Sequence, residues 1–157
     1  MVNVSLDIST ADPSRVTSYP AASSPGRARN MRAIKRTGTK PEVAIRSALH
    51  AKGYRFRKDY LVRIGDFKVK PDIVFTRKRV AVFVDGCFWH SCPSHGRMPS
   101  TNEWYWSPKL TRNQTRDAEV NHALSTGGWT VIRIWEHVDV GDALDAIEHS
   151  FDSMSSA

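Results

Sequence analysis

Two cysteines and two histidines lie in residues 86–101, a segment rich in Gly, Pro and Ser that predicts an irregular loop. Cys87, Cys92 and His95 have the spacing C-x4-C-x2-H, and thiolate and imidazole groups at short spacing are typical ligands of tetrahedral Zn²⁺. A structural zinc site needs a fourth ligand, and His137 is the best candidate because it follows a strand that could return beside the loop. The alternatives are a Cys87–Cys92 disulfide or two buried thiols with unrelated histidines. Zinc is favoured because so few cysteines indicate a reducing compartment.

Two carboxylates form a second candidate site. Asp72 follows Pro71 within one predicted strand, and Asp85 lies at the end of the next. A carboxylate in the middle of a sheet costs free energy unless it is paired or binds a cation. Pairing of the two strands would bring Asp72 close to the strand-end carbonyl of Val84, which predicts a Mg²⁺ site. The alternative is that Asp72 caps a turn. Pro-Asp followed by another acid resembles the PD-(D/E)xK nucleases, although no lysine stands at the expected place.

Large aromatic residues are the third unusual feature. Phe88-Trp89 lie in the polar loop, and Trp104-Tyr105-Trp106 precede a predicted helix. Rings in such places can wedge between base pairs or stack on bases, but more often they cover a core. Their closeness to the candidate zinc loop, in a chain with a basic half, favours the nucleic-acid interpretation.

Charge divides the chain into two parts. Residues 26–80 carry 17 basic and 4 acidic side chains, a net charge of +13, whereas residues 81–157 carry −5 and the whole chain +7. This division suits a protein that holds a polyanion with one part and acts on it with another, although a solvated basic face is the alternative. A protein-binding or small-molecule-binding role fits the basic half poorly. No apolar run approaches the roughly 18 residues of a membrane span, so we expect no membrane association.

The length of 157 residues, 40% of them apolar, suits one globular domain. We expect residues 1–25 to be a flexible leader, 26–152 a single domain and 153–157 a tail. Residues 27–36 predict a short helix or an arm that orders on a partner.

Three helices are predicted, with caps at Thr39, Ser107 and Asp139. The first has Glu42 three residues after the cap, as in a capping box, and ends at Gly53, and the second ends near Ser125. Predicted strands cover Tyr54–Arg57, Asp66–Phe75, Val80–Val84 and Trp129–Trp135, the second and third forming an antiparallel hairpin. This order predicts an α/β (α+β) fold around a mixed sheet.

Six blocks of residues, in order from about Arg29 to His137, resemble the very short patch repair DNA mismatch endonucleases. The blocks are Asn30-Met31-Arg32-Ala33-Ile34, Thr39-Lys40-Pro41-Glu42, Pro71-Asp72-Ile73-Val74, Gly86-Cys87-Phe88-Trp89-His90, Asn113 with Arg116-Asp117, and Gly128-Trp129 leading to Trp135-Glu136. Members of this family nick one strand 5′ to the thymine of a T·G mismatch, which arises when 5-methylcytosine deaminates. The resemblance implies a restriction-endonuclease-like fold, with a central mixed β-sheet flanked by helices, catalytic Mg²⁺ and structural Zn²⁺.

The resemblance also implies roles for single residues. Asp72 would be the metal-binding carboxylate and His90 the catalytic histidine that activates or positions water, with Glu42 and Asp117 as supporting acids. The residues implied to contact DNA are the intercalating Phe88, Trp89 and Trp106, the mismatch readers Lys109 and Asn113, and a minor-groove arm that includes Met31 and Arg32.

Two departures from the family pattern concern the metal sites. The family's loop is typically a histidine-rich run ending in cysteine, and cysteine commonly follows its Trp-Glu pair, whereas this chain supplies a Cys₂His₂ zinc set of Cys87, Cys92, His95 and His137. Asp85 stands where many members carry an active-site histidine. We expect Asp85 either to bind Mg²⁺ together with Asp72 and Val84 or to leave water activation wholly to His90.

Two other functions remain open at this point: a nuclease of the same fold acting on matched or branched DNA, and a non-catalytic, zinc-stabilised DNA-binding module. The expected partner is double-stranded DNA with a T·G mismatch, and other mismatch-repair proteins are further candidates. We expect a monomer, because the chain has no long heptad pattern or exposed apolar strand. The expected location is the cytoplasm, in association with the nucleoid.

Overall fold

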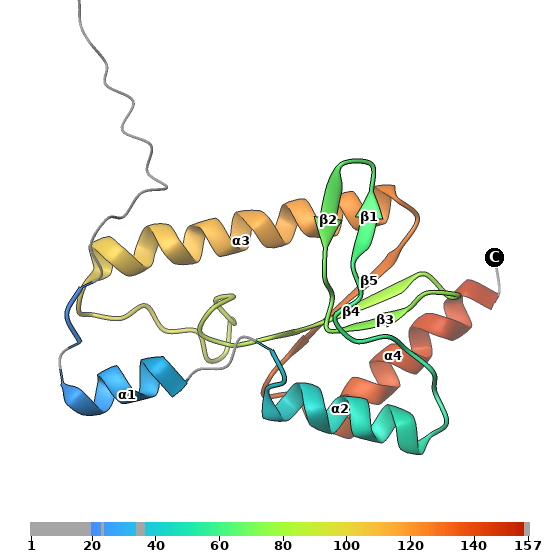
Figure 1. The fold of residues 1–157 in the computed structure, drawn as a ribbon, viewed down its shortest axis with the longest axis horizontal. Coiled ribbons are helices and arrows are strands. Elements are labelled where there is room, and N and C mark those ends of the chain that lie inside the picture. The colour runs from blue at the N-terminus through green and yellow to red at the C-terminus, as the bar shows by residue number, and fades with distance from the viewer. Residues whose placement is uncertain (1–19, 23, 34–36, 156–157) are drawn as a thin grey trace, which may run out of the picture.

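The computed structural model describes residues 20–22, 24–33 and 37–155. In chain order the elements are α1 (Pro25–Ala33), α2 (Lys40–Ala51), β1 (Val62–Ile64), β2 (Phe67–Val69), β3 (Ile73–Phe75), β4 (Val80–Asp85), α3 (Glu103–Thr126), β5 (Thr130–Trp135) and α4 (Val140–Ser155) (Figure 1). Within these ranges no helix has the length and apolar character needed to cross a membrane. The mixed α/β architecture is the one that the sequence predicts.

The central sheet has the strand order β3-β4-β5 and is mixed. β4 is antiparallel to β3, with Ile73 opposite Val82, and parallel to β5, with Val82 opposite Ile132. The parallel pair needs a long connection, which the loop after β4 and helix α3 supply. β1 and β2 form a separate antiparallel pair.

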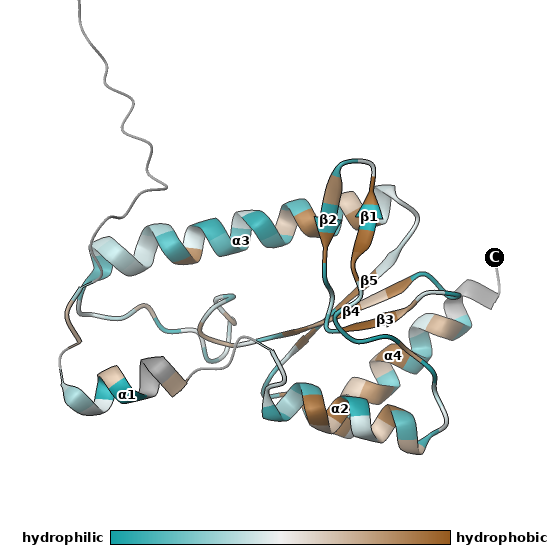
Figure 2. Cartoon of the chain, in the orientation of Figure 1, coloured by the Kyte–Doolittle hydropathy of each residue, from teal (hydrophilic) through white to brown (hydrophobic). Residues whose placement is uncertain are grey.

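Helices cover both faces of the sheet, with α2 and α4 on one side and α3 on the other (Figure 1). Because side chains alternate along a strand, Ile73, Val82 and Ile134 join the core formed with α2 and α4. Val74 and Ala81 join a second core with the C-terminal part of α3 and the β1–β2 pair. Most of α3 is hydrophilic (Figure 2), so much of this helix is free to carry polar site residues.

Two of the three predicted helix caps, Thr39 and Asp139, agree with the structure. Thr39 caps α2 and accepts a hydrogen bond from the backbone of Glu42, and the chain leaves this helix through Gly53, whose φ is +85°. Asp139 precedes α4, and its side chain accepts a hydrogen bond from the Gly141 N–H at 2.7 Å. Helix α1 (Pro25–Ala33) overlaps the predicted segment 27–36, of which residues 34–36 lie outside the described residues. Helix α4 continues to Ser155, beyond the predicted end of the domain at residue 152.

Two predicted strands differ from the structure. The predicted strand Asp66–Phe75 is divided into β2, which pairs with β1, and β3, which pairs with β4. The division falls at Pro71, which has no N–H to contribute to a ladder. The predicted strand Tyr54–Arg57 is reduced to an isolated bridge between Arg57 and Val74.

The predicted helix start at Ser107 is wrong, because α3 begins at Glu103 and includes Pro108. A proline this close to the N-terminus removes only one helical hydrogen bond. The additional turn brings aromatic rings together: Tyr105 is buried, and the Trp106 ring lies 5.3 Å from that of Phe88. Packing of these rings offsets the lost hydrogen bond.

Ile147 on α4 is a sensitive test of the main core, because its side chain is fully buried. We expect Ile147→Ala to lower the free energy of unfolding by about 2–5 kcal/mol, through lost burial and the cavity left behind. Chemical denaturation is the measurement, and the exposed Asp145→Ala on the same helix is the control, with an expected change within about 0.5 kcal/mol. Equal effects of the two substitutions would contradict the described packing of α4.

Candidate functional site

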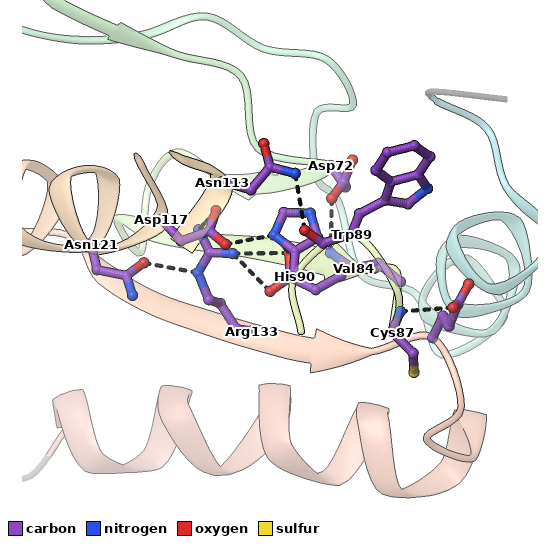
Figure 3. Close-up of polar contacts among 11 residues, drawn as sticks. Asp72, Val84, Cys87, Trp89, His90, Asn113, Asp117, Asn121 and Arg133 are labelled. Carbon is purple, nitrogen blue, oxygen red and sulfur yellow. Dashed lines mark hydrogen bonds and ion pairs between the residues drawn. The ribbon is translucent and has the colours of Figure 1, made fainter. Parts of the chain in front are cut away.

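The first part of the site lies where β3 and β4 meet. Asp72 immediately precedes β3, and its Oδ2 atom accepts a hydrogen bond from the backbone N–H of Val84 at 2.8 Å. The antiparallel pairing of the two strands makes these residues neighbours, as the sequence predicts, although the group of Val84 that contacts Asp72 is the N–H and not the predicted carbonyl. Figure 3 shows the carboxylate of Asp72 directed at the end of β4.

The surroundings of Asp72 disfavour its negative charge. Burial raises the pKa of Asp72 to about 6, with the nearby charges of Glu42 and Asp85 acting in the same direction and the Val84 hydrogen bond and Arg46 opposing them. A carboxylate in this position gains free energy when a cation binds beside it. Oxygen ligands suit a hard divalent ion, and Asp72 together with the Val84 carbonyl fits such an ion chemically.

The second part of the site is a histidine–carboxylate pair. His90 lies in the loop after β4, and its Nδ1 atom is 2.5 Å from Oδ2 of Asp117 on α3 (Figure 3). The other oxygen of Asp117 accepts a hydrogen bond from Nη2 of Arg133 at 3.0 Å. A carboxylate paired with a guanidinium can only accept, so Nδ1 of His90 carries the hydrogen and Nε2 is left as the basic nitrogen.

Arg133 on β5 is a site residue that the sequence reasoning missed. Its Nη1 atom contacts both oxygens of Asp85, at 2.9 and 2.7 Å, and its Nε donates to Oδ1 of Asn121 at 2.9 Å. The signal in the sequence that could have identified Arg133 is a charged residue inside a largely apolar strand, Thr130–Trp135. A charge at such a position requires a partner.

Asp85 and Glu42, both predicted site residues, are buried. The contacts of Asp85 are dominated by Arg133, and its Oδ1 is 3.8 Å from Nδ1 of His90, beyond hydrogen-bond distance. Glu42 accepts hydrogen bonds from the Thr39 hydroxyl at 2.9 Å and from the Gly38 N–H at 2.7 Å. It therefore orders the start of α2, while its charge acts on Asp72.

The third part is a cluster of potential metal ligands. The ligand atoms of Cys87, Cys92, His95 and His137 all lie within 4.8 Å of one another. Nδ1 of His137 is 3.0 Å from Sγ of Cys87 and 3.9 Å from Sγ of Cys92. Ligands on tetrahedral Zn²⁺ are about 3.3–3.8 Å apart, given bonds of about 2.0–2.3 Å, so the cluster has the dimensions of a four-coordinate site. Both cysteines are free thiols and not a disulfide.

The local backbone holds these ligands in place. Oε1 of Glu136, next to His137, accepts a hydrogen bond from the Cys87 N–H at 2.7 Å. Gly96 donates its N–H to the Cys92 carbonyl at 2.7 Å, and a Cβ at Gly96 would lie 2.6 Å from that oxygen, so the turn requires glycine. Burial raises the pKa of the Cys87 thiol to about 11, with Cys92 and Glu136 contributing, and a bound cation would favour the thiolate instead.

The aromatic residues form the fourth part, beside His90. The rings of Phe88, Trp89 and Trp106 are 5.1–5.9 Å apart, and all three side chains are half-buried. The Lys109 ammonium lies 5.3 Å from the ring centre of Trp89 and 5.5 Å from that of Trp106. Asn113 donates to the Trp89 carbonyl at 2.9 Å. These five predicted DNA-contacting residues are thus brought together between the loop and α3.

Three further residues are Met31 and Arg32 on α1 and Trp104 on α3. The predicted minor-groove residues Met31 and Arg32 belong to α1, but their side chains lie outside the described part of the structure. Trp104, at the start of α3, is one of the aromatic residues that the sequence analysis names, although the resemblance assigns it no DNA contact, and 61% of its surface is exposed. It stands next to the aromatic cluster in sequence, with its ring 6.0 Å from that of Tyr105.

The raised pKa of Asp72 leads to a pH-dependent stability effect. Because the native pKa of about 6 exceeds the usual 3.8, ionised Asp72 destabilises the native state above pH 6, and the penalty disappears as the pH falls toward 4. Without added magnesium, Asp72→Asn should melt a few degrees higher than the wild type at pH 7.5, with a smaller difference at pH 5. Added Mg²⁺ should raise the melting temperature of the wild type more than that of the variant. Scanning calorimetry measures both, and equal melting at pH 7.5 would contradict the burial of an ionised Asp72.

Comparisons with known proteins agree with this arrangement. Residues 22–94 match a family model described as DNA mismatch endonuclease Vsr. The chain is 60% identical over 143 residues to Type II nicking enzyme V.NaeI of Lentzea aerocolonigenes, covering 86% of each protein. It is 42% identical over 107 residues to Type II nicking enzyme V.XorIIP of Xanthomonas oryzae pv. oryzae, covering 68% of this chain and 76% of the relative. With DNA mismatch endonuclease Vsr of Escherichia coli (strain K12) it shares 33% identity over 111 residues, covering 70% and 69%. The chain therefore belongs to the DNA mismatch endonuclease Vsr family and is a DNA-cleaving hydrolase.

Proposed function

We propose that the protein nicks one strand of a DNA duplex 5′ to the thymine of a T·G mismatch, by magnesium-dependent hydrolysis, and so begins the repair of deaminated 5-methylcytosine. The observation that carries this proposal is the convergence of three groups on one place. An oxygen-ligand site at Asp72, a histidine–carboxylate pair and a cluster of aromatic rings all lie at the end of β4. The names of the relatives, which are nicking enzymes and a mismatch endonuclease, support the same reaction.

Asp72 and the Val84 carbonyl are the groups that would hold Mg²⁺. When bound, the ion supplies positive charge against the oxygens of the scissile phosphate and lowers the pKa of a coordinated water. The protein prepares the site by keeping Asp72 partly desolvated, near Glu42 and Asp85, so that cation binding is favourable there.

His90 is the group that moves the proton. Its Nε2 atom accepts a proton from the attacking water, whose oxygen bonds to phosphorus as the bond to the leaving sugar oxygen breaks. The leaving oxygen takes up a proton from solvent and becomes the sugar hydroxyl at the nick. Asp117 holds Nδ1–H throughout and stabilises the imidazolium that forms. The pair thus provides a general base with a fixed orientation.

The aromatic cluster provides selectivity for mismatched DNA. Phe88, Trp89 and Trp106 insert beside the T·G pair, where a mismatched step costs less free energy to unstack than a matched one. Lys109 and Asn113, at the base of the cluster, lie where polar groups can contact the exposed base edges. The basic residues between 26 and 80 bind the phosphate backbone.

Zn²⁺ is the ion that fits the Cys87, Cys92, His95 and His137 cluster, because thiolate and imidazole ligands with tetrahedral spacing are typical of structural zinc. His90 lies in the chain between the two cysteines. Zinc ligation therefore restrains the loop segment that carries the proposed general base.

Nicking is tested on labelled duplexes with one T·G pair in varied contexts, against a matched T·A duplex. We expect Mg²⁺-dependent cuts 5′ to the mismatched thymine only. Asp72→Asn and His90→Ala should each lower the rate at least about 100-fold, because they remove the metal ligand and the base. The exposed His149→Ala is the control and should nick at the wild-type rate. Equal cutting of both duplexes would instead indicate a nuclease for matched DNA, and wild-type rates in the two variants would contradict the assigned roles.

Zinc is tested by elemental analysis of protein purified without chelator. We expect one zinc per chain, and little zinc in Cys92→Ser or His137→Ala, together with a lower melting temperature and slower nicking. Ser94→Ala, an exposed non-ligand position in the same loop, should keep its zinc. Full zinc content in both ligand variants, or none in the wild type, would contradict this set of ligands.

A further inference from the structure

Arg133 connects three polar side chains, from β4 and α3, through its guanidinium group. Nη1 binds Asp85 at the end of β4. Nη2 binds Asp117 on α3, and Nε binds Asn121 one turn further along α3 (Figure 3). Every nitrogen of the guanidinium therefore has an acceptor. Only the planar fork of arginine can serve three acceptors in this way, because a lysine presents a single nitrogen.

The register of the sheet explains why the guanidinium lies at this place. Arg133 is directly opposite Phe83 in the parallel β4–β5 ladder, and its guanidinium carbon lies 4.8 Å from the centre of the Phe83 ring. Asp85 is two residues beyond Phe83 and is therefore on the same face of β4. This is the face covered by α3, so the side chain is held between the sheet and the helix.

The contact with Asp117 affects the histidine. Nη2 of Arg133 binds one carboxylate oxygen of Asp117 while Nδ1 of His90 contacts the other. This arrangement fixes the plane of the carboxylate. Because an ionised carboxylate only accepts hydrogen bonds, the imidazole must present N–H at Nδ1.

The contact with Asp85 affects the metal site. Both oxygens of this carboxylate lie within hydrogen-bond distance of Nη1 of Arg133, and its side chain is only 7% exposed. A metal ion bound to Asp85 would have to compete with a guanidinium already in contact with both oxygens. The charge of Asp85 is thus compensated by the protein itself.

We propose that Arg133 is a positioning residue for the nicking reaction: through Asp117 it sets the tautomer of His90, and it takes Asp85 as its own counter-ion in place of a metal. The proposal rests on the proposed function for its link to nicking. Asp85 is then an anchor for Arg133, and Asp72 is the side chain that binds the divalent ion.

The test uses the charge-balanced double variant Arg133→Met/Asp85→Asn, because Arg133→Met alone would leave a buried carboxylate unpaired. We expect this variant to fold and to bind mismatched DNA with an affinity within threefold of the wild type. Its kcat should fall about 10–100-fold with KM little changed, which is the typical loss when a residue that orients a site residue through a second side chain is removed. The ¹⁵N shifts of the His90 ring, assigned by their absence in His90→Ala, should show protonated Nδ1 in the wild type and a mixture of tautomers in the double variant. Mn²⁺ binding, followed by electron paramagnetic resonance, should stay within threefold of the wild type, whereas Asp72→Asn should weaken it at least tenfold.

The matched control is Lys52→Met/Glu148→Gln, which removes an ion pair of 2.9 Å between α2 and α4, away from the site. It should leave kcat and the His90 ring shifts unchanged. Wild-type kcat and ring shifts in the Arg133→Met/Asp85→Asn variant would overturn the positioning role. A tenfold or greater loss of Mn²⁺ binding in that variant would make Asp85 a metal ligand and overturn its role as an anchor. If the wild type nicks no duplex, the proposed function fails, while the ring shifts and Mn²⁺ binding still decide this inference.

Discussion

β4 is hydrogen-bonded to β3 on one side and to β5 on the other, so the groups at its C-terminal end are fixed relative to both neighbours. Pairing with β3 places Asp72 against Val84, and pairing with β5 places Arg133 near Asp85. The chain then turns directly into the loop that carries Cys87 and His90. A rigid central strand thus aligns groups that come from distant parts of the sequence, which is what a reaction sensitive to small displacements requires.

Two sets of potential metal ligands with different chemistry lie close to each other around the end of β4. Sulfur and imidazole groups gather on the loop after β4 and at His137, whereas oxygen groups gather where β3 meets β4. Soft and borderline ions prefer the first set, and hard ions prefer the second. His90 lies between them, held by the carboxylate of Asp117. An ion held by the first set and a different ion held by the second would therefore not exchange places.

Local patterns predicted much of this molecule. The Thr39 cap, the β3–β4 hairpin and the Cys–His cluster follow from turn chemistry, alternation and ligand spacing, and each is present. The start of α3 was missed because Ser107-Pro108 resembles a cap followed by a first helical residue, whereas packing of the preceding aromatic rings extends the helix. Arg133 was missed because its partners are set by strand register and by a helix crossing, which no single segment reveals. Long-range pairing, not local preference, decides such positions.

Helix α3 is one continuous element that carries Trp106 in the aromatic cluster, Asp117 against His90, and Leu124 in the core. Trp106 and Asp117 are 11 residues apart, which is about three helical turns and about 16 Å of rise. Inserting or deleting one residue in this interval would rotate one end by about 100° relative to the other. The helix therefore fixes the distance and orientation between the aromatic cluster and the His90–Asp117 pair. We therefore expect this interval of α3 to tolerate no change in length without loss of that alignment.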